Sequence, residues 1–201
     1  MRLFIALDIP SGIRAAIARF QDALRPLASD ARWVSQDSFH ITLKFIGEQS
    51  PARLDALRQA LSSVHARSVS VSFRQSGFFP NERSARVFWV GIEAGPELAE
   101  LAMAVDQATA TLAIPREKIP FTPHLTLARA GQMHSSRGPS GSPSARPGDR
   151  PNQRFFRVQE KLAKMEPPEF GTMTASEFFL YESRLSPRGA QYTKLARFAL
   201  S

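Results

Sequence analysis

Two short stretches with the same arrangement of polar side chains constrain the fold of this chain more than any other feature. Residues 38–47 read SFHITLKFIG and residues 122–131 read TPHLTLARAG, so each holds a histidine followed two positions later by a threonine. The apolar and β-branched neighbours of both patterns are typical of strands. Side chains at positions i and i+2 of a strand point to the same face. Each pattern therefore predicts a strand with a polar pair on one face and apolar residues on the other.

The segments around these two motif strands follow the same order along the chain. Apolar residues recur at helical spacing in four places, which begin after Ser11, after Ser50-Pro51, after Pro96 and at Phe155. Strand-like runs cover residues 2–7, 69–73, 85–93, 175–185 and 190–200, and the last four are expected to form two hairpins. The chain therefore reads as helix, motif strand, helix and hairpin, and then as the same four elements again.

This repeated order predicts an α+β fold. Each set of elements would form an antiparallel sheet with helices on its outer face, and the two lobes would be related by an approximate two-fold axis. The 201 residues fit a single bilobal domain, residues 1–201, whose lobes share a core. The first strand must join one of the sheets, and its spacing does not say which. If the lobes face each other, the two polar pairs meet in a central cleft.

Charge and composition exclude several classes of protein. The net charge of +8 is typical of a protein that binds polyanions, of which nucleic acid is the commonest, although an arginine-rich composition bias is an equally good explanation. There is no cysteine, which excludes disulfides, thiol catalysis and cysteine-ligated zinc. No stretch approaches the ~18 consecutive apolar residues of a membrane helix. We expect a cytoplasmic monomer without a membrane partner.

Two imidazoles and two hydroxyls in one cleft suit in-line displacement at phosphorus. One histidine would take a proton from the nucleophile and the other would give a proton to the leaving oxygen, because the pKa of imidazole lies near neutrality. The hydroxyls of Thr42 and Thr126 would donate hydrogen bonds to the non-bridging oxygens of a phosphate. His40 and His124 are therefore the candidate catalytic residues.

Simpler explanations of the histidines exist. A single histidine in a strand is usually structural, but two equivalent pairs in a repeated order are hard to reach by chance. The histidines could also bind a metal ion, although no Asp, Glu or Cys stands nearby at the spacing of a third ligand. We therefore expect neither a metal nor another cofactor.

Basic residues follow both motifs. Lys44 shares the face of His40 and Thr42 if strict alternation holds, so it could reach a bound phosphate. Arg129 ends the second motif strand, and strict alternation places it on the face opposite His124 unless a bulge re-aims it.

Motifs spread over nearly the whole chain carry a resemblance to a known family. They read RLFIALDIP, FHITLKFIGE, ARVFWVGIE, TPHLTLARAG and FFLYESRLSPRGAQYTKLARFAL. With them the sequence resembles the 2H phosphoesterase superfamily, which is named for two His-x-Thr-x motifs. Within it the chain is similar to the RNA 2′,3′-cyclic phosphodiesterases, historically called 2′-5′ RNA ligases. The resemblance implies a bilobal fold with both motifs in a central cleft.

The same resemblance implies a reaction and a role for each site residue. The reaction is hydrolysis of an RNA 2′,3′-cyclic phosphate to a 2′-phosphate, without a metal. His40 matches the proton donor and His124 the proton acceptor of the family. Thr42 and Thr126 match the threonines that hold the phosphate, and Arg129 matches a position that contacts the substrate. The implied partner is RNA with a 2′,3′-cyclic phosphate end or a related cyclic nucleotide.

One segment interrupts the repeat and is longer than we expect for the family. Residues 131–154 are rich in serine, glycine and proline and carry four arginines and one aspartate. Such a composition cannot bury a core, so the segment is expected to be a flexible loop insertion beside the second motif. Its positive charge favours a role in capturing long RNA, and an inert insertion is the alternative.

Other functions remain open at this point. The chain could ligate RNA halves through a 2′-5′ linkage, or act on a different small cyclic or 2′-5′-linked nucleotide. It could also be a basic RNA-binding protein without turnover, although binding alone needs no second imidazole.

Overall fold

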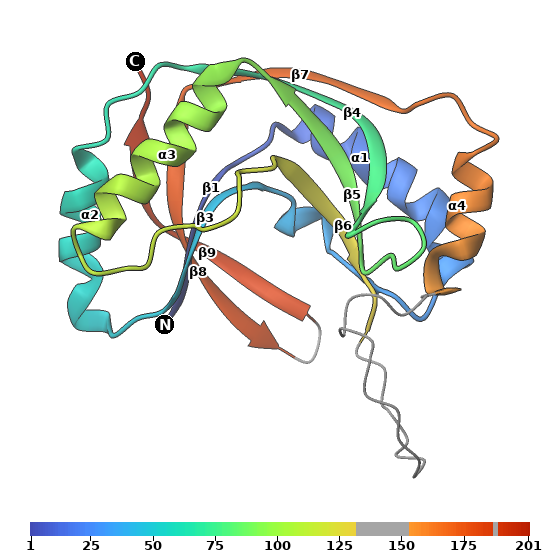
Figure 1. The fold of residues 1–201 in the computed structure, drawn as a ribbon, viewed down its shortest axis with the longest axis horizontal. Helices are drawn as coiled ribbons and strands as arrows, with labels where there is room; N and C mark the ends of the chain where they lie inside the picture. Colours follow the sequence, from blue (N-terminus) through green and yellow to red (C-terminus); the bar gives the residue numbers. More distant parts are fainter. Residues whose placement is uncertain (132–152, 187–188) are drawn as a thin grey trace, which may run out of the picture.

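Two antiparallel sheets form the framework of the protein. The computed structural model describes residues 1–131, 153–186 and 189–201. Sheet A has the strand order β3-β1-β8-β9, and sheet B has the order β2-β6-β5-β4-β7 (Figure 1). The strands are β1 (Arg2–Leu7), β2 (Arg32–Trp33), β3 (Ile41–Glu48), β4 (Val69–Phe79), β5 (Val87–Ala94), β6 (His124–Arg129), β7 (Glu169–Ala175), β8 (Glu177–Ser186) and β9 (Gly189–Ala199). The α+β class and the antiparallel pairing expected from the sequence are confirmed.

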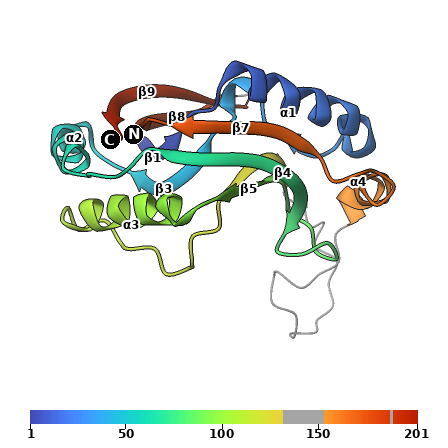
Figure 2. The same cartoon turned by 90° about the horizontal axis from the view of Figure 1, so that it is seen from above.

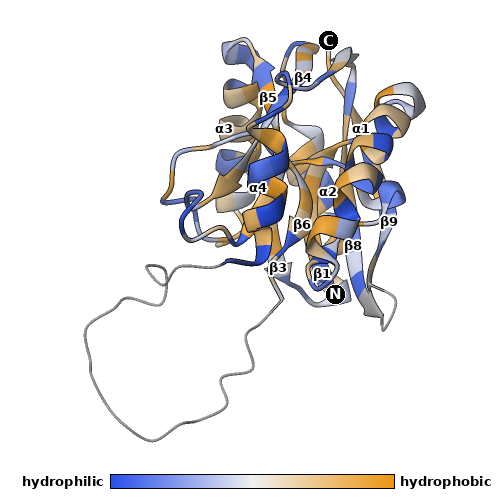
Figure 3. Ribbon diagram, turned by 90° about the vertical axis from the view of Figure 1, so that its right-hand side faces the viewer, coloured by the Kyte–Doolittle hydropathy of each residue, from blue (hydrophilic) through white to orange (hydrophobic). Residues whose placement is uncertain are grey.

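Helices accompany both sheets. They are α1 (Ser11–Leu24), α2 (Leu54–Ser62), α3 (Pro96–Ala110) and α4 (Phe156–Leu162), with the short 3₁₀ turns η1 (Arg25–Ala28), η2 (Gln36–Ser38), η3 (Pro51–Arg53) and η4 (Gln153–Phe155). α3 contacts β3 and α2 contacts β9, whereas α1 contacts β7. Figure 2 shows α1 and α3 on opposite sides of the strands. In Figure 3 apolar and polar residues lie side by side on α1 and α4, as amphipathic helices require.

The two lobes are not the two halves of the chain. The hairpin β4–β5 follows the first motif in sequence, yet β5 pairs with β6, the strand of the second motif. The C-terminal hairpin β8–β9 returns to the N-terminus, because β8 pairs with β1. β1 pairs with β3 on its other edge. The expectation that each half builds its own sheet was therefore wrong, since the two halves exchange their hairpins and each sheet contains strands from both halves.

Local signals located the helix starts better than they located the strands. Pro51 opens η3 before α2, and Pro96 is the first residue of α3, as expected from proline's fixed φ. The helix expected to begin at Phe155 is short, because α4 starts at Phe156 and ends at Leu162. The strand β7 was not expected from the sequence, because its residues EFGTMTA lack an alternating apolar pattern.

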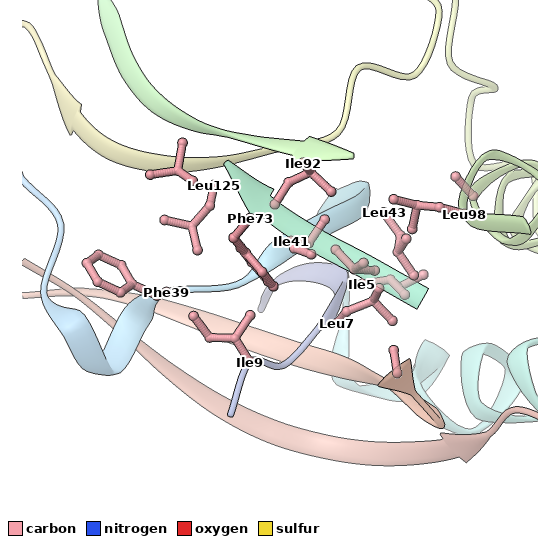
Figure 4. Packing of buried hydrophobic residues seen from close by; sticks show 14 of the residues in the cluster. Ile5, Leu7, Ile9, Phe39, Ile41, Leu43, Phe73, Ile92, Leu98 and Leu125 are labelled. Atoms are coloured by element: carbon pink, nitrogen blue, oxygen red, sulfur yellow. The ribbon is translucent and has the colours of Figure 1, made fainter. Parts of the chain in front are cut away.

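One hydrophobic core joins the two sheets. Ile5 and Leu7 of β1 and Ile41 of β3 lie against residues of sheet B, among them Phe73 and Leu125 (Figure 4). All of these side chains are almost completely buried. Because the apolar face of each motif strand is used in this core, its polar face is left for a site.

Most of the expected loop insertion, residues 132–152, lies outside the described residues. Its two flanks are joined to each other and to the lobe of sheet B. Nη1 of Arg154 donates a hydrogen bond to the carbonyl oxygen of Gly131 at 2.8 Å, and its Nε donates to Asp30. In the described part of the chain, no helix has the length and apolar character needed to cross a membrane.

Candidate active site

The two motif strands present their polar pairs as the alternation predicts. His40 directly precedes β3, and His124 is the first residue of β6. Both histidines and both threonines are half-buried, whereas the alternating residues Ile41 and Leu125 are completely buried in the core. β3 and β6 contact each other although they belong to different sheets, so the two polar pairs come together at the junction of the sheets.

Both imidazoles are held by the same backbone contact. Nδ1 of His40 lies 2.7 Å from the carbonyl oxygen of Ser38, and Nδ1 of His124 lies 2.8 Å from that of Thr122. A carbonyl oxygen only accepts hydrogen bonds, so Nδ1 carries a hydrogen in each ring. The neutral ring is therefore held in the tautomer that leaves Nε2 as the basic nitrogen. Each side chain thus offers Nε2 for proton transfer.

An aromatic wall surrounds His40. Its ring centroid lies 4.8 Å from Phe4, 5.2 Å from Tyr192 and 6.4 Å from Tyr181. Phe4 and Tyr181 are buried and stacked on each other, and they form a second apolar cluster on the site face of sheet A. Burial among these rings lowers the pKa of His40 to about 4, and the positive charge of Arg129 adds to this effect.

A second wall lies beside His124. Phe79 meets the imidazole edge-on at 4.9 Å and lies 5.1 Å from Trp89, which pairs with Thr126 across β5 and β6. The indole packs so tightly on β4 that a Cβ at Gly77 would lie 2.5 Å from its ring. This close approach explains the glycine at that position. Burial lowers the pKa of His124, and the charge of Arg129 again contributes.

A β-bulge turns Arg129 toward the site. Thr126 pairs with Trp89 and Ala128 pairs with Phe88, so β6 has one extra residue, Leu127, between two consecutive pairs. The extra residue reverses the alternation, and Arg129, paired with Val87, takes the face of Thr126. Its positive charge acts to lower the pKa of His40, His124 and Tyr192, as expected of a guanidinium on the same side of the strands as these rings.

A second bulge turns Lys44 away from the site. Thr42 pairs with Ala6 and Lys44 pairs with Ile5, so Leu43 is the extra residue in β3. Ile5 is part of the core, and the Lys44 side chain beside it is only 1% exposed. Phe45 takes the place on the site face that was expected for Lys44. Its side chain is 56% exposed, and its ring centroid lies 6.3 Å from that of Phe4.

Lys44 makes a buried ion pair in place of the expected phosphate contact. Its ammonium donates to Oδ1 of Asp106 and, at 2.9 Å, to the carbonyl oxygen of Pro115. Asp106 also accepts hydrogen bonds from Nε of Arg116 at 2.8 Å and from the backbone N–H of Glu117 at 3.1 Å. The expectation that Lys44 binds phosphate was therefore wrong, because its ammonium is bound to Asp106 of α3 and to Pro115 in the segment after α3.

Sequence analysis did not identify the tyrosines of the site. Tyr181 and Tyr192 come from the C-terminal hairpin, and only the pairing of β8 with β1 brings them next to His40. Of the aromatic residues near the motifs, Phe88 is buried in the core. In the described residues, the indole N–H of Trp89 is a buried donor without an acceptor. No group of three His, Asp or Glu side chains arranged for a metal ion occurs in the described part of the chain.

Comparisons with known proteins agree with this geometry. A family model described as LigT like Phosphoesterase matches residues 7–89. An RNA 2′,3′-cyclic phosphodiesterase of Thermus thermophilus is 33% identical over 210 residues, which cover 100% of this chain and 90% of that protein. One of Archaeoglobus fulgidus is 30% identical over 98% of this chain and 99% of its own length. The crystal structure of E. coli LigT complexed with 3′-AMP superposes with a TM-score of 0.74 at 27% identity, over 100% of this chain and 98% of that chain.

Proposed function

Because the chain belongs to the family of LigT-like phosphoesterases, we propose that it hydrolyses RNA 2′,3′-cyclic phosphate ends to 2′-phosphates with His40 and His124 as acid and base. The observation that carries this proposal is the matched pair of imidazoles. Each ring is held at Nδ1 by a carbonyl oxygen two residues earlier, and each presents Nε2 at the junction of the two sheets. The name shared by the relatives supplies the substrate class.

The reaction is one displacement at phosphorus. Nε2 of His124 accepts a proton from water as the water oxygen bonds to phosphorus. The bond from phosphorus to O3′ breaks, and Nε2 of His40 gives its proton to O3′. The phosphate stays on O2′, one water is consumed, and exchange with solvent returns both rings to their starting protonation states. Each proton transfer contributes about 10²–10⁴-fold to the rate.

Fixed donors neutralise the charge that develops on the phosphate. The hydroxyls of Thr42 and Thr126 donate to its non-bridging oxygens, and the guanidinium of Arg129 supplies a positive charge from the same face. This arrangement holds the phosphate with side chains alone. We therefore propose that the reaction needs no metal ion.

Binding of the substrate prepares His40 to act as the acid. In the free protein burial lowers the pKa of His40 to about 4, so the ring is neutral at pH 7. A phosphate anion bound between the imidazoles favours their charged forms and raises both pKa values. The acid is thus protonated when its substrate is present, whereas the empty site keeps neutral rings.

The test is turnover of each of the four nucleoside 2′,3′-cyclic phosphates, with the product isomer identified by phosphorus NMR. We expect the 2′-phosphate as product. His40→Ala and His124→Ala are each expected to lower kcat by about 10²–10⁴-fold. His65→Ala is the matched control, because His65 is exposed and lies outside the site. Absence of turnover with all four substrates would overturn the proposal in favour of ligation or RNA binding.

A further inference from the structure

A pocket of about 420 Å³ borders His40 and has no lining residue from the second motif. It lies between η2 and β9, whose chains approach each other closely enough for Ser38 Oγ to donate to the carbonyl oxygen of Ala190 at 3.4 Å. Tyr181 and Tyr192 form its aromatic wall, and Asp37 lies at the η2 side. The volume is in the range of pockets that bind small organic ligands.

The proposed reaction fixes which part of the substrate lies beside His40. O3′ leaves the phosphorus atom but remains on the ribose, and His40 gives O3′ its proton. The ribose and its base must therefore lie on the His40 side of the phosphorus atom. The attacking water approaches from the opposite side, next to His124, because the displacement is in line. The substrate's nucleoside and the pocket are thus on the same side of the site.

We propose that this pocket binds the nucleoside that carries the cyclic phosphate and that Asp37 selects guanine there. This inference rests on the proposed function. Tyr192 is half-buried, meets the His40 ring edge-on at 5.2 Å, and lines the pocket, so it borders both the reacting phosphate and the nucleoside. Aromatic side chains of this kind bind any base through its π face, so Tyr192 supplies affinity without selection.

One hydrogen-bond acceptor of the pocket remains available to a base. Arg14 donates to Asp8 at 2.7 Å and to the carbonyl oxygen of Gln36 at 2.6 Å, and the ammonium of Lys194 also binds Asp8. Both cations of the pocket are therefore bound to the same carboxylate, which neutralises one of their two positive charges. The carboxylate of Asp37 is exposed and makes no hydrogen bond or ion pair with the described residues. The four charged side chains of the lining carry no net charge together, and Asp37 is the carboxylate among them that is left to accept hydrogen bonds from the N–H groups of a base.

Guanine matches this acceptor better than the other bases do. Its N1–H and its amino group lie side by side and can donate to the two oxygens of one carboxylate in the paired geometry that makes such bonds strong. Uracil, cytosine and adenine each offer a single N–H or amino group on the corresponding edge. We expect about a tenfold higher kcat/KM for the guanosine substrate than for the uridine substrate.

The experiment compares four proteins on the four nucleoside 2′,3′-cyclic phosphates: wild type, Asp37→Ala, Tyr192→Leu and Asp55→Ala. Asp37→Ala is expected to reduce the kcat/KM of the guanosine substrate by about tenfold and to leave that of uridine within about twofold. Tyr192→Leu is expected to raise KM for all four substrates. Asp55, an exposed residue of α2 outside the pocket, is the matched control and should change nothing.

A binding measurement separates this inference from the proposed function. Guanosine 2′-monophosphate is titrated into the protein and followed by amide NMR, with inorganic phosphate as the second probe. The nucleotide is expected to shift Thr193 and Asp37 in the pocket as well as Thr42 and Thr126, whereas inorganic phosphate shifts only the two threonines of the motifs. Equal shifts with both probes, or an unchanged base preference in Asp37→Ala, would overturn the pocket assignment even if hydrolysis is observed.

Discussion

Replacing Lys44 by methionine tests whether this lysine stabilises the fold or binds the phosphate, as strict strand alternation predicts. Methionine keeps most of the side-chain volume and removes the charge. In the wild type the ammonium is buried between Asp106 and the carbonyl oxygen of Pro115. Burial acts to raise the pKa of Asp106, whereas the hydrogen bonds from Arg116 and from the backbone N–H of Glu117 act to lower it. These two bonds remain when the ammonium is lost, so they continue to favour the charged carboxylate.

The expected loss in the free energy of unfolding depends on the hydrogen bonds that Asp106 retains. Removing one member of a buried ion pair costs about 3–5 kcal/mol, because the remaining charge is left without its partner. Asp106 retains the guanidinium of Arg116 at 2.8 Å and the backbone N–H of Glu117 at 3.1 Å. We therefore expect Lys44→Met to lower the free energy of unfolding by an amount near the lower limit, about 3 kcal/mol.

Urea unfolding at pH 7 measures this loss, and steady-state kinetics under conditions where the variant is folded measure KM. The expected result is a lower unfolding midpoint with an unchanged KM for a cyclic nucleotide. The double variant Lys44→Met/Asp106→Leu should regain part of the stability, because it leaves no uncompensated buried charge. Lys164→Met, at an exposed lysine, is the control and should change stability by less than about 0.5 kcal/mol. An unchanged midpoint with a raised KM would refute the reasoning and return Lys44 to the phosphate.

Three further predictions concern the site. His40 has a pKa of about 4 in the folded protein against 6.5 when unfolded, so the unfolded state binds more protons between these values and stability is lost as pH falls through this window. Wild type should therefore lose up to about 3 kcal/mol more than His40→Gln between pH 7 and pH 4 in chemical unfolding, and equal losses would contradict the lowered pKa. Arg129→Met should raise KM. In an NMR titration it should also raise the pKa of both His40 and His124, because a nearby positive charge no longer opposes their protonation. Unchanged pKa values would mean that the bulge does not bring the guanidinium to the site. Chelation by EDTA should leave hydrolysis unchanged, and activity that is lost in EDTA and restored by a divalent ion would replace the acid–base scheme by metal-activated water.

Local chemistry made several parts of this protein predictable. The alternation in the two motifs correctly indicated that Ile41 and Leu125 are buried while the histidines and threonines share a face. The prolines at 51 and 96 marked helix starts because their φ angle suits a first helical turn. These features depend only on neighbouring residues, so the sequence by itself determined the candidate catalytic pair.

Tertiary structure decided which other side chains reach that pair. A single extra residue in each motif strand, Leu43 in one and Leu127 in the other, reverses the alternation beyond it, so that Lys44 enters the core and Arg129 joins the site. A bulge of this kind is fixed by the register with the neighbouring strand, which lies far away in the sequence. The same is true of Tyr181 and Tyr192, which reach His40 only because β8 pairs with β1. Which distant strands pair depends on how much apolar surface the whole core buries. The periodicity of a single segment does not reveal this amount.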